Sequence, residues 1–230
     1  MRVPTALWGV MIIAGLLAIA GFAGVDPRLH AISETLNRPG PPDPTDFYHR
    51  TARLWDVLRW PAHWSAAAAA VAALALFHPR GPRVAIGVLI VFFAVAITAN
   101  GLQSVFGRLR PVPAKAAAGD RTENFHLTFE GPRVDSLYER KSYGFPSGEA
   151  SVGFAMATAM ALALPRWTLL WLLLALLVCC ARLVAAAHYL SDVSTGALFG
   201  VASALAILSR FNQPPAEAAS GSQDDEVTAQ

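Results

Sequence analysis

The chain has 230 residues, of which 54% are hydrophobic and 15% charged, and its mean hydropathy is +0.42. Soluble domains usually carry about a quarter charged residues, so this composition argues against an ordinary soluble protein. The formal net charge of +2 is too small to indicate a nucleic-acid partner. The apolar residues form long runs separated by charged loops, a pattern typical of a polytopic membrane protein.

Six apolar segments are long enough, or nearly so, to cross a bilayer, which needs roughly 20 mostly apolar residues. They lie at about 5–23, 62–77, 84–102, 149–164, 167–187 and 193–209. The second and fourth are short and rich in alanine, so the sequence defines their ends poorly. The pattern predicts an all-α fold, a bundle of six transmembrane helices in a multi-pass membrane protein.

The first apolar segment follows Met1-Arg2 and ends near Ala18-Ile19-Ala20, which resembles a signal-peptidase site. Its apolar stretch is long for a cleaved signal peptide. We therefore expect a retained helix, with cleavage as the alternative.

Two long loops, at about 24–61 and 103–148, fall on the same outer face if the N-terminus is intracellular. The short connections and the tail then lie inside. Four arginines there agree with the positive-inside tendency: Arg80, Arg83, Arg166 and Arg210. We expect both long loops to face the periplasm of a bacterial-type inner (plasma) membrane.

The chain divides into three predicted parts. Residues 1–61 hold the first transmembrane helix and an outer loop, residues 62–210 a core with five transmembrane helices, and residues 211–230 a disordered acidic tail. Within the outer loop, residues 47–60 mix aromatic and basic side chains. This stretch is either an interfacial helix beside lipid head groups or an aromatic anchor for the next span.

Three polar clusters stand at the predicted outer ends of the last four spans. They are residues 107–111, residues 145–149, and the trio Arg182, His188 and Asp192. Ionisable side chains near an intramembrane segment are costly, and by default they argue for function.

The first two clusters suit a phosphate site. Arg110, with Arg182 of the third cluster, offers a permanently charged fork that matches phosphoryl oxygens. Ser147 and Gly148 precede a predicted helix, so the backbone N–H groups there point at an anion. The adjacent Cys179 and Cys180 offer no metal-ligand spacing.

The third cluster suits nucleophilic attack on phosphorus. A ring nitrogen of His188 can attack if Asp192 holds the other nitrogen protonated. On one continuous helix Arg182 would lie about 120° away from His188. We therefore expect a bend in the chain near His188.

These motifs also carry a resemblance. Arg110-Pro111, Pro146-Ser147-Gly148 and Arg182-x5-His188-x3-Asp192, within roughly residues 62–209, resemble the signature of the type 2 phosphatidic acid phosphatase family. The resemblance implies a six-helix membrane lipid phosphatase that needs no metal or other cofactor. It further implies that His188 is the nucleophile, that a phosphohistidine forms on it, and that Asp192 is its partner. The phosphate would be bound by Arg110, Arg182, Ser147 and the Gly148 N–H.

The sequence departs from the family pattern at two main positions, with Ala181 in place of serine as a lesser change. Gln103 replaces the lysine that opens the first motif; it still donates a hydrogen bond, and Arg108 is a candidate for the missing charge. Glu149 replaces the histidine that is expected to protonate the leaving group. A carboxylic acid can take that role only while it holds a proton.

The leading hypothesis is therefore an active phosphatase with Glu149 as general acid, or one acting on diphosphate lipids, whose leaving group needs less protonation. Candidate substrates are lipid A, undecaprenyl diphosphate, phosphatidylglycerophosphate and phosphatidic acid. The alternative is a catalytically impaired family member that binds phospholipid or transports it. The sequence leaves the lipid and the oligomeric state open.

Overall fold

The computed structural model describes residues 3–36, 47–111, 129–132 and 143–211. The described residues form helices and their connections, with two isolated β-bridges and no strand among them. The main helices are α1 (Thr5–Ala20), α2 (Asp26–Leu36), α3 (Phe47–Leu58), α4 (Trp64–Phe77), α5 (Gly81–Phe106), α7 (Gly148–Ala163), α8 (Thr168–Val184) and α9 (Leu190–Phe211). The all-α prediction is confirmed for these residues. Nearly all of the predicted acidic tail lies outside them.

Each of the six apolar segments predicted from the sequence falls on a helix, but the helices differ in length. Four stretches are long and apolar enough to cross a membrane: Thr5–Ser33, Gly81–Phe106, Pro165–Val184 and Leu190–Arg210. A fifth is added if Arg53–Ala62 and Trp64–Phe77, which are bent by 48°, count as one span. Helix α7 is apolar but has 16 residues. A polytopic membrane protein is therefore supported, and the number six stays a prediction.

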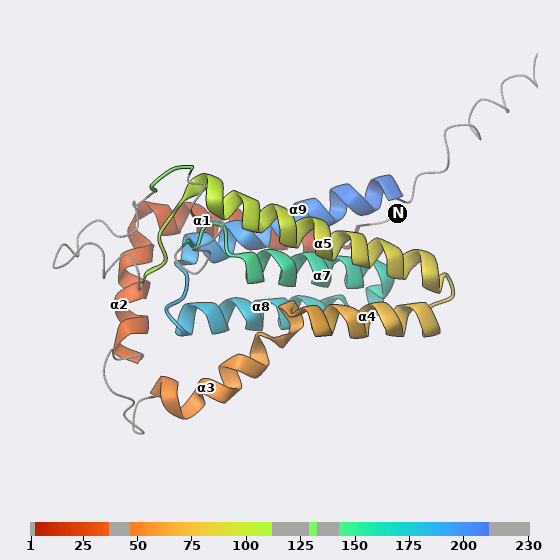
Figure 1. The fold of residues 1–230 in the computed structure, drawn as a ribbon, viewed down its shortest axis with the longest axis horizontal. Coiled ribbons are helices and arrows are strands. Elements are labelled where there is room, and N and C mark those ends of the chain that lie inside the picture. Colours follow the sequence, from red (N-terminus) through yellow and green to blue (C-terminus); the bar gives the residue numbers. More distant parts are fainter. Residues whose placement is uncertain (1–2, 37–46, 112–128, 133–142, 212–230) are drawn as a thin grey trace, which may run out of the picture.

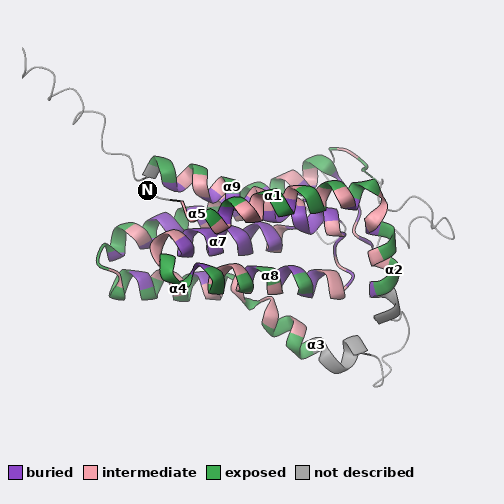
Figure 2. Ribbon diagram, turned by 180° about the vertical axis from the view of Figure 1, so that it is seen from behind, coloured by how far each residue is buried: buried purple, intermediate pink, exposed green. Residues whose placement is uncertain are grey.

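Helix α7 lies at the centre of the bundle. Figure 1 shows α1, α4, α5, α8 and α9 running along it, and every residue of α7 from Ala150 to Ala161 is buried, as Figure 2 shows. The surrounding helices instead expose large apolar side chains, among them Ile12, Ile97 and Leu169. Exposed apolar surface of this extent suits contact with lipid chains.

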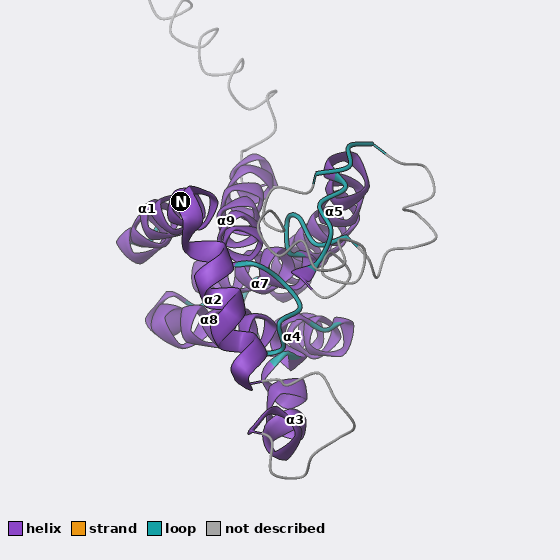
Figure 3. Ribbon diagram, turned by 90° about the vertical axis from the view of Figure 1, so that its left-hand side faces the viewer, coloured by secondary structure: helices purple, strands orange, loops and turns teal. Residues whose placement is uncertain are grey.

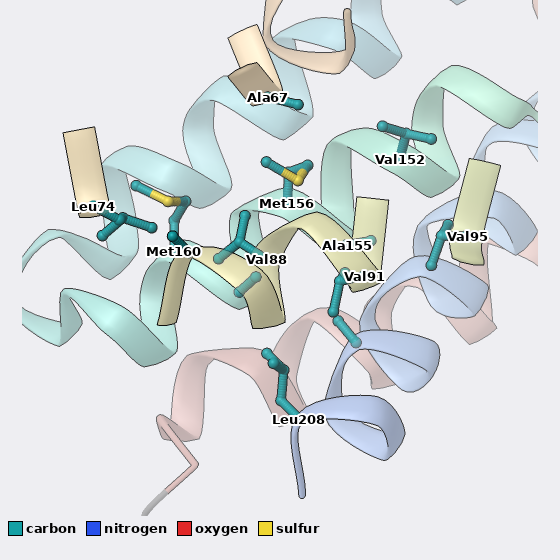
Figure 4. Packing of buried hydrophobic residues seen from close by; sticks show 13 residues of the cluster. Ala67, Leu74, Val88, Val91, Val95, Val152, Ala155, Met156, Met160 and Leu208 are labelled. Carbon is teal, nitrogen blue, oxygen red and sulfur yellow. The ribbon is translucent and has the colours of Figure 1, made fainter. Parts of the chain in front are cut away.

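The main hydrophobic core lies between α4, α5, α7 and α9. Figure 4 shows valines of α5 (Val88, Val91, Val95) and methionines of α7 (Met156, Met160) meeting there. Alanines such as Ala155 and Ala159 keep the helices close, because a small side chain lets two backbones approach.

Glycines bring α9 onto α7. A Cβ at Gly200 would lie 2.2 Å from the Ser151 carbonyl oxygen, and one at Gly196 would lie 2.7 Å from that of Ser147. No larger side chain fits at either position without moving the backbone. This close approach fixes the start of α7 against the first turns of α9, where two of the sequence motifs lie.

Residues 47–60, for which the sequence left two interpretations open, form α3 and the start of a short 3₁₀ turn (Trp60–Ala62). Figure 3 shows α3 lying beside the bundle, with α2 crossing in front of the bundle end. The 3₁₀ turn packs against α7 and α8. This packing brings Arg59, directly after α3, to the end of the bundle that carries the motifs.

Candidate active site

The three polar clusters meet at one end of the bundle. There α5 ends, α7 begins and the chain passes from α8 to α9, while α2 crosses this end (Figures 1 and 3). The sequence placed the clusters at the ends of separate spans, and the fold brings those ends together.

The connection between α8 and α9 contains the expected bend. Helix α8 ends at Val184, and Ala186 adopts a left-handed conformation with φ of 48°. This conformation is unfavourable for a residue with a side chain. The turn is closed by a 3.1 Å hydrogen bond from the Ala187 N–H to the Arg182 carbonyl. His188 therefore lies in the connection, and Asp192 lies in the first turn of α9.

The buried His188 ring is oriented by a backbone carbonyl. Its Nδ1 lies 3.0 Å from the Gly144 oxygen and 3.7 Å from Oδ2 of Asp192. A carbonyl oxygen can only accept a hydrogen bond, so Nδ1 carries the hydrogen and Nε2 keeps its lone pair. The sequence identified Asp192 as the partner of this ring; in the structure Gly144 lies closer, and Asp192 stays within ion-pair distance.

Burial lowers the pKa of His188 below its ordinary value, and the nearby charges of Arg110 and Arg182 lower it further, while Asp192 opposes the change. The ring is therefore neutral near pH 7. A neutral imidazole with a free Nε2 lone pair has the form that a nucleophile needs.

The lowered pKa predicts where activity is lost in acid. If His188 is the nucleophile, as the resemblance implies, the neutral ring is the reactive form, and kcat/KM should fall only as the pH drops through a value below 6.5, the ordinary pKa of histidine. The measurement is kcat/KM against pH for phosphate release, with the folded fraction checked at each pH. An acid limb centred above that value would contradict a buried neutral His188.

Gly144 is a site residue that the sequence analysis missed. A Cβ there would lie 3.1 Å from Cγ of Arg110, 3.2 Å from Nδ1 of His188 and 3.3 Å from Oδ2 of Asp192. These approaches are tighter than side chains ordinarily make, so glycine lets the backbone come close to three functional groups at once. A lone glycine in a long loop gives no local signal of this role.

Asp192 is fully buried and held on both oxygens. Its Oδ2 accepts the Tyr189 N–H at 2.9 Å, and its Oδ1 accepts from Nη1 of Arg108 at 2.5 Å. A buried carboxylate needs such partners, because burial of an unpaired charge is very costly.

Arg108 lies behind Asp192. Its side chain is fully buried, with Nη2 2.9 Å from Oδ2 of Asp26 and Nη1 bonded to Asp192. The guanidinium also lies 4.4 Å from the Tyr189 ring centre and within 6.0 Å of three phenylalanine rings, those of Phe22, Phe129 and Phe145. The sequence offered Arg108 as a candidate phosphate ligand. The structure instead has both of its terminal nitrogens bonded to protein groups.

Asp26, at the start of α2, is a second residue that the sequence analysis missed. It is 1% exposed, accepts the Ser191 N–H at 3.0 Å, and bonds the Ser191 hydroxyl. Its carboxylate therefore ties α2 to the start of α9 as well as to Arg108. An acidic residue directly after the first apolar span is a costly placement, and that signal was available in the sequence.

Arg110 and Arg182 place positive charge near His188. Nε of Arg110 donates to the Tyr143 carbonyl at 2.9 Å, and Nε of Arg182 lies 3.4 Å from Oε2 of Glu149. Burial lowers the pKa of Arg110, while Glu149 and Asp192 raise it and Arg59 lowers it. Arg110 thus lies near two carboxylates, those of Glu149 and Asp192, and near the guanidinium of Arg59.

The second cluster, together with Gln103, is tied to its neighbours by hydrogen bonds. The Ser147 hydroxyl caps α7, and the Ser147 N–H donates to the Asp192 carbonyl at 3.0 Å. Nε2 of Gln103 donates to the Pro146 carbonyl at 2.8 Å. Gly148 is the first residue of α7, where backbone N–H groups can meet an anion. Phosphate binding by Ser147, Gly148 and Gln103 stays a prediction.

Glu149 pairs with an arginine that the sequence analysis did not assign to the site. Nε of Arg59 lies 3.2 Å from Oε2 of Glu149, and Nη1 of Arg59 lies 3.2 Å from Oδ1 of Asp56. The side chains of Arg59 and Glu149 are 39% and 33% exposed. This ion pair therefore stays open to solvent, in contrast to the buried network around Arg108.

A cavity of about 170 Å³ lies between α2, the end of α8 and the start of α9, and it reaches His188 and Asp26. Its lining includes five large apolar residues: Leu29, Ile32, Leu183, Val184 and Leu190. Among the residues that the structure describes, no three His, Cys, Asp or Glu side chains are grouped so that they could hold a metal ion. Independence from metal stays a prediction.

The family profile of the PAP2 superfamily matches residues 84–214, more than half of the chain. The chain belongs to the PAP2 superfamily. Members of this superfamily are phosphatases, and the resemblance drawn from the three motifs is confirmed. Asp26 and Arg59 lie outside the matched region, so part of the site comes from the N-terminal segment.

A curated relative of this PAP2 protein is the bacitracin transport permease protein BcrC of Bacillus licheniformis. The two are 31% identical over 121 residues, which cover 51% of this chain and 60% of the relative. The match thus spans less than two thirds of the relative's length. No solved structure matches the chain.

Proposed function

We propose that this PAP2 protein is a membrane lipid phosphatase that works through a phosphohistidine on His188. The observation that carries the proposal is the state of the His188 ring. Nδ1 is committed to the Gly144 carbonyl at 3.0 Å, which leaves the Nε2 lone pair for phosphorus. The charges of Arg110 and Arg182 lie close enough to influence this ring, and they supply the complement to a phosphoryl group.

The reaction has two steps. Nε2 of His188 forms a bond to phosphorus, while the bond from phosphorus to the leaving oxygen breaks and its electron pair stays on that oxygen. Water then displaces the histidine and inorganic phosphate is released. Arg110 and Arg182 stabilise charge on the equatorial oxygens in both steps, and Asp192 stabilises the positive charge of the phosphorylated ring.

A lipid substrate is supported by the position of the site. It lies at one end of an apolar helical bundle, next to a cavity lined largely by apolar residues. We propose that the substrate keeps its tail in the bilayer and that the site faces the periplasm of a bacterial inner membrane. Candidates are lipid A, undecaprenyl diphosphate, phosphatidylglycerophosphate and phosphatidic acid.

A second candidate function is lipid binding or transport without turnover, and the name of the relative, a transport permease, favours it. The two candidates are separated by assaying purified protein in detergent on a panel of these lipids. A phosphatase releases phosphate, and His188→Ala stops the release. Binding or transport alone gives no phosphate on any lipid, together with lipid association that survives His188→Ala. The exchange His78→Gln is the control, because His78 lies in the α4–α5 turn at the other end of the bundle.

Replacing Glu149 with glutamine tests its role as the proton source for the leaving group. The variant should lose hydrolysis of a lipid monophosphate by about 100-fold or more, since an alkoxide leaves poorly without a proton. Hydrolysis of a diphosphate should fall much less, because a phosphate leaves without protonation. The measurement is kcat/KM for both substrates on one lipid chain. Equal losses on the two would contradict the general-acid role.

A further inference from the structure

The ion pair between Arg59 and Glu149 joins parts of the chain that are 90 residues apart. Arg59 follows α3, outside the region that the superfamily profile matches, and Glu149 is in the first turn of α7. Arg59 also contacts Asp56 of α3, and this second contact helps to orient its side chain toward the site.

Arg59 adds a third positive charge around Glu149. The Glu149 carboxylate lies 3.2 Å from Nε of Arg59 and 3.4 Å from Nε of Arg182. Arg110 lies near enough to both Glu149 and Arg59 to respond to their charges. Two guanidinium groups thus contact this carboxylate, and a third lies near it. Arg110 and Arg182 suffice to bind the oxygens of a single phosphoryl group. With a monophosphate substrate, Arg59 would therefore have no phosphoryl oxygen to bind.

The contact of Arg59 with Glu149 indicates on which side of the phosphoryl group Arg59 would act. In an in-line displacement the leaving group departs opposite the attacking atom. His188 lies 3.7 Å from Asp192, whereas Arg59 and Arg182 both contact Glu149, at 3.2 and 3.4 Å. Arg59 contacts Glu149 directly, so if Glu149 protonates the leaving group of a monophosphate, Arg59 lies next to the position of that leaving group.

We propose that Arg59 is a specificity-determining residue that binds the leaving phosphoryl group of a lipid diphosphate. The proposal rests on the proposed phosphatase function and names its substrate class. The ion pair between Arg59 and Glu149 is partly exposed, which supports this role. A diphosphate can therefore reach the Arg59 guanidinium and replace the Glu149 carboxylate as its partner. Arg108, by contrast, is fully buried.

The chemistry balances without an acid. Nε2 of His188 bonds to the terminal phosphorus, and the bond from that phosphorus to the bridging oxygen breaks. The electron pair stays on the bridging oxygen, which becomes an oxygen of the departing lipid monophosphate, and Arg59 pairs with the new charge. Water then displaces His188, and both of its protons end on the released inorganic phosphate.

The test compares farnesyl diphosphate with farnesyl monophosphate as substrates of the full-length protein in detergent. Arg59→Gln should lower kcat/KM for the diphosphate by about 10- to 100-fold, the usual value of one charge-assisted hydrogen bond. The kcat/KM for the monophosphate should not fall by a comparable factor, since Arg59 can affect that substrate only through Glu149. Arg53→Gln is the matched control: it removes the same charge from an exposed position on α3, shortly before Arg59, and the kcat/KM values for both substrates should stay unchanged.

A further comparison removes the effect of leaving Glu149 without its partner. In the Glu149→Gln variant there is no carboxylate at position 149 that could repel the substrate once Arg59 is gone. Adding Arg59→Gln to this variant should still lower kcat/KM for the diphosphate by a similar factor. A merely structural contact between α3 and α7 would instead lower the values for both substrates together.

The outcomes separate this proposal from the one on which it rests. A selective loss of diphosphate hydrolysis supports the role of Arg59. If the wild type hydrolyses both lipids and Arg59→Gln lowers both equally or neither, the role of Arg59 is wrong while the phosphatase stands. If the wild type hydrolyses neither farnesyl substrate and none of the other candidate lipids, the phosphatase proposal fails. The role of Arg59 then fails with it.

Discussion

His188→Ala is expected to lower phosphate release by a factor on the order of 10⁴ or more, because no other group supplies the covalent intermediate. His188 is buried against Gly144 and Asp192, so a neighbouring side chain cannot take over attack on phosphorus without rearrangement of the site. The measurement is phosphate release by purified wild type and variant on the best substrate of the panel.

The variant must also be shown to fold. Removing the ring leaves the Gly144 carbonyl without this hydrogen bond, which costs about 1 to 3 kcal/mol of stability. His188→Gln keeps a donor near that carbonyl and is expected to be as inactive as the alanine variant while melting closer to the wild type. Substantial phosphate release by either folded variant would overturn the assignment of the nucleophile.

Arg108→Met is expected to cause the second large effect, a loss of about 3 to 5 kcal/mol of stability, because it leaves two buried carboxylates without their shared cation. Asp26 and Asp192 both bond Arg108, and both are at most 1% exposed. The measurement is thermal unfolding in detergent, and phosphate release should fall as well, since Asp192 loses the group that fixes it.

The double variant Asp26→Asn, Arg108→Met checks this explanation. Replacing Asp26 as well removes one unpaired charge, so the double variant should unfold at a higher temperature than Arg108→Met alone. If Arg108→Met is as stable and active as the wild type, Arg108 is not what holds Asp192. The alternative role as a phosphate ligand would instead predict a raised KM with unchanged stability.

The sequence predicted much of the fold because apolar runs of bilayer length leave few alternatives to helices. The spacing of Arg182, His188 and Asp192 also predicted a bend near His188, and Ala186 accounts for it. These features depend on residues near one another in the chain, which a single sequence can relate.

The rest of the candidate site depends on contacts between distant segments. Gly144 matters because its backbone touches His188. Asp26 matters because α2 folds back onto the start of α9, and Arg59 because the turn after α3 packs on α7. No local pattern marks Gly144 or Arg59, and for Asp26 the sequence shows only an acidic residue directly after an apolar span, without its partners. The charge of Arg108 and its position in the first motif suggested a phosphate ligand. In the folded protein its guanidinium instead pairs with the buried carboxylates of Asp26 and Asp192.

The central claim is the covalent phosphohistidine, and rapid-quench labelling tests it most directly. Farnesyl diphosphate labelled with ³²P on the terminal phosphate is mixed with the protein in detergent and quenched in alkaline dodecyl sulfate at short times. We expect label on the wild-type chain that is stable in alkali and lost in acid, and none on His188→Ala. Steady release of phosphate by the wild type with no label at any quench time, or equal labelling of His188→Ala, would contradict the account.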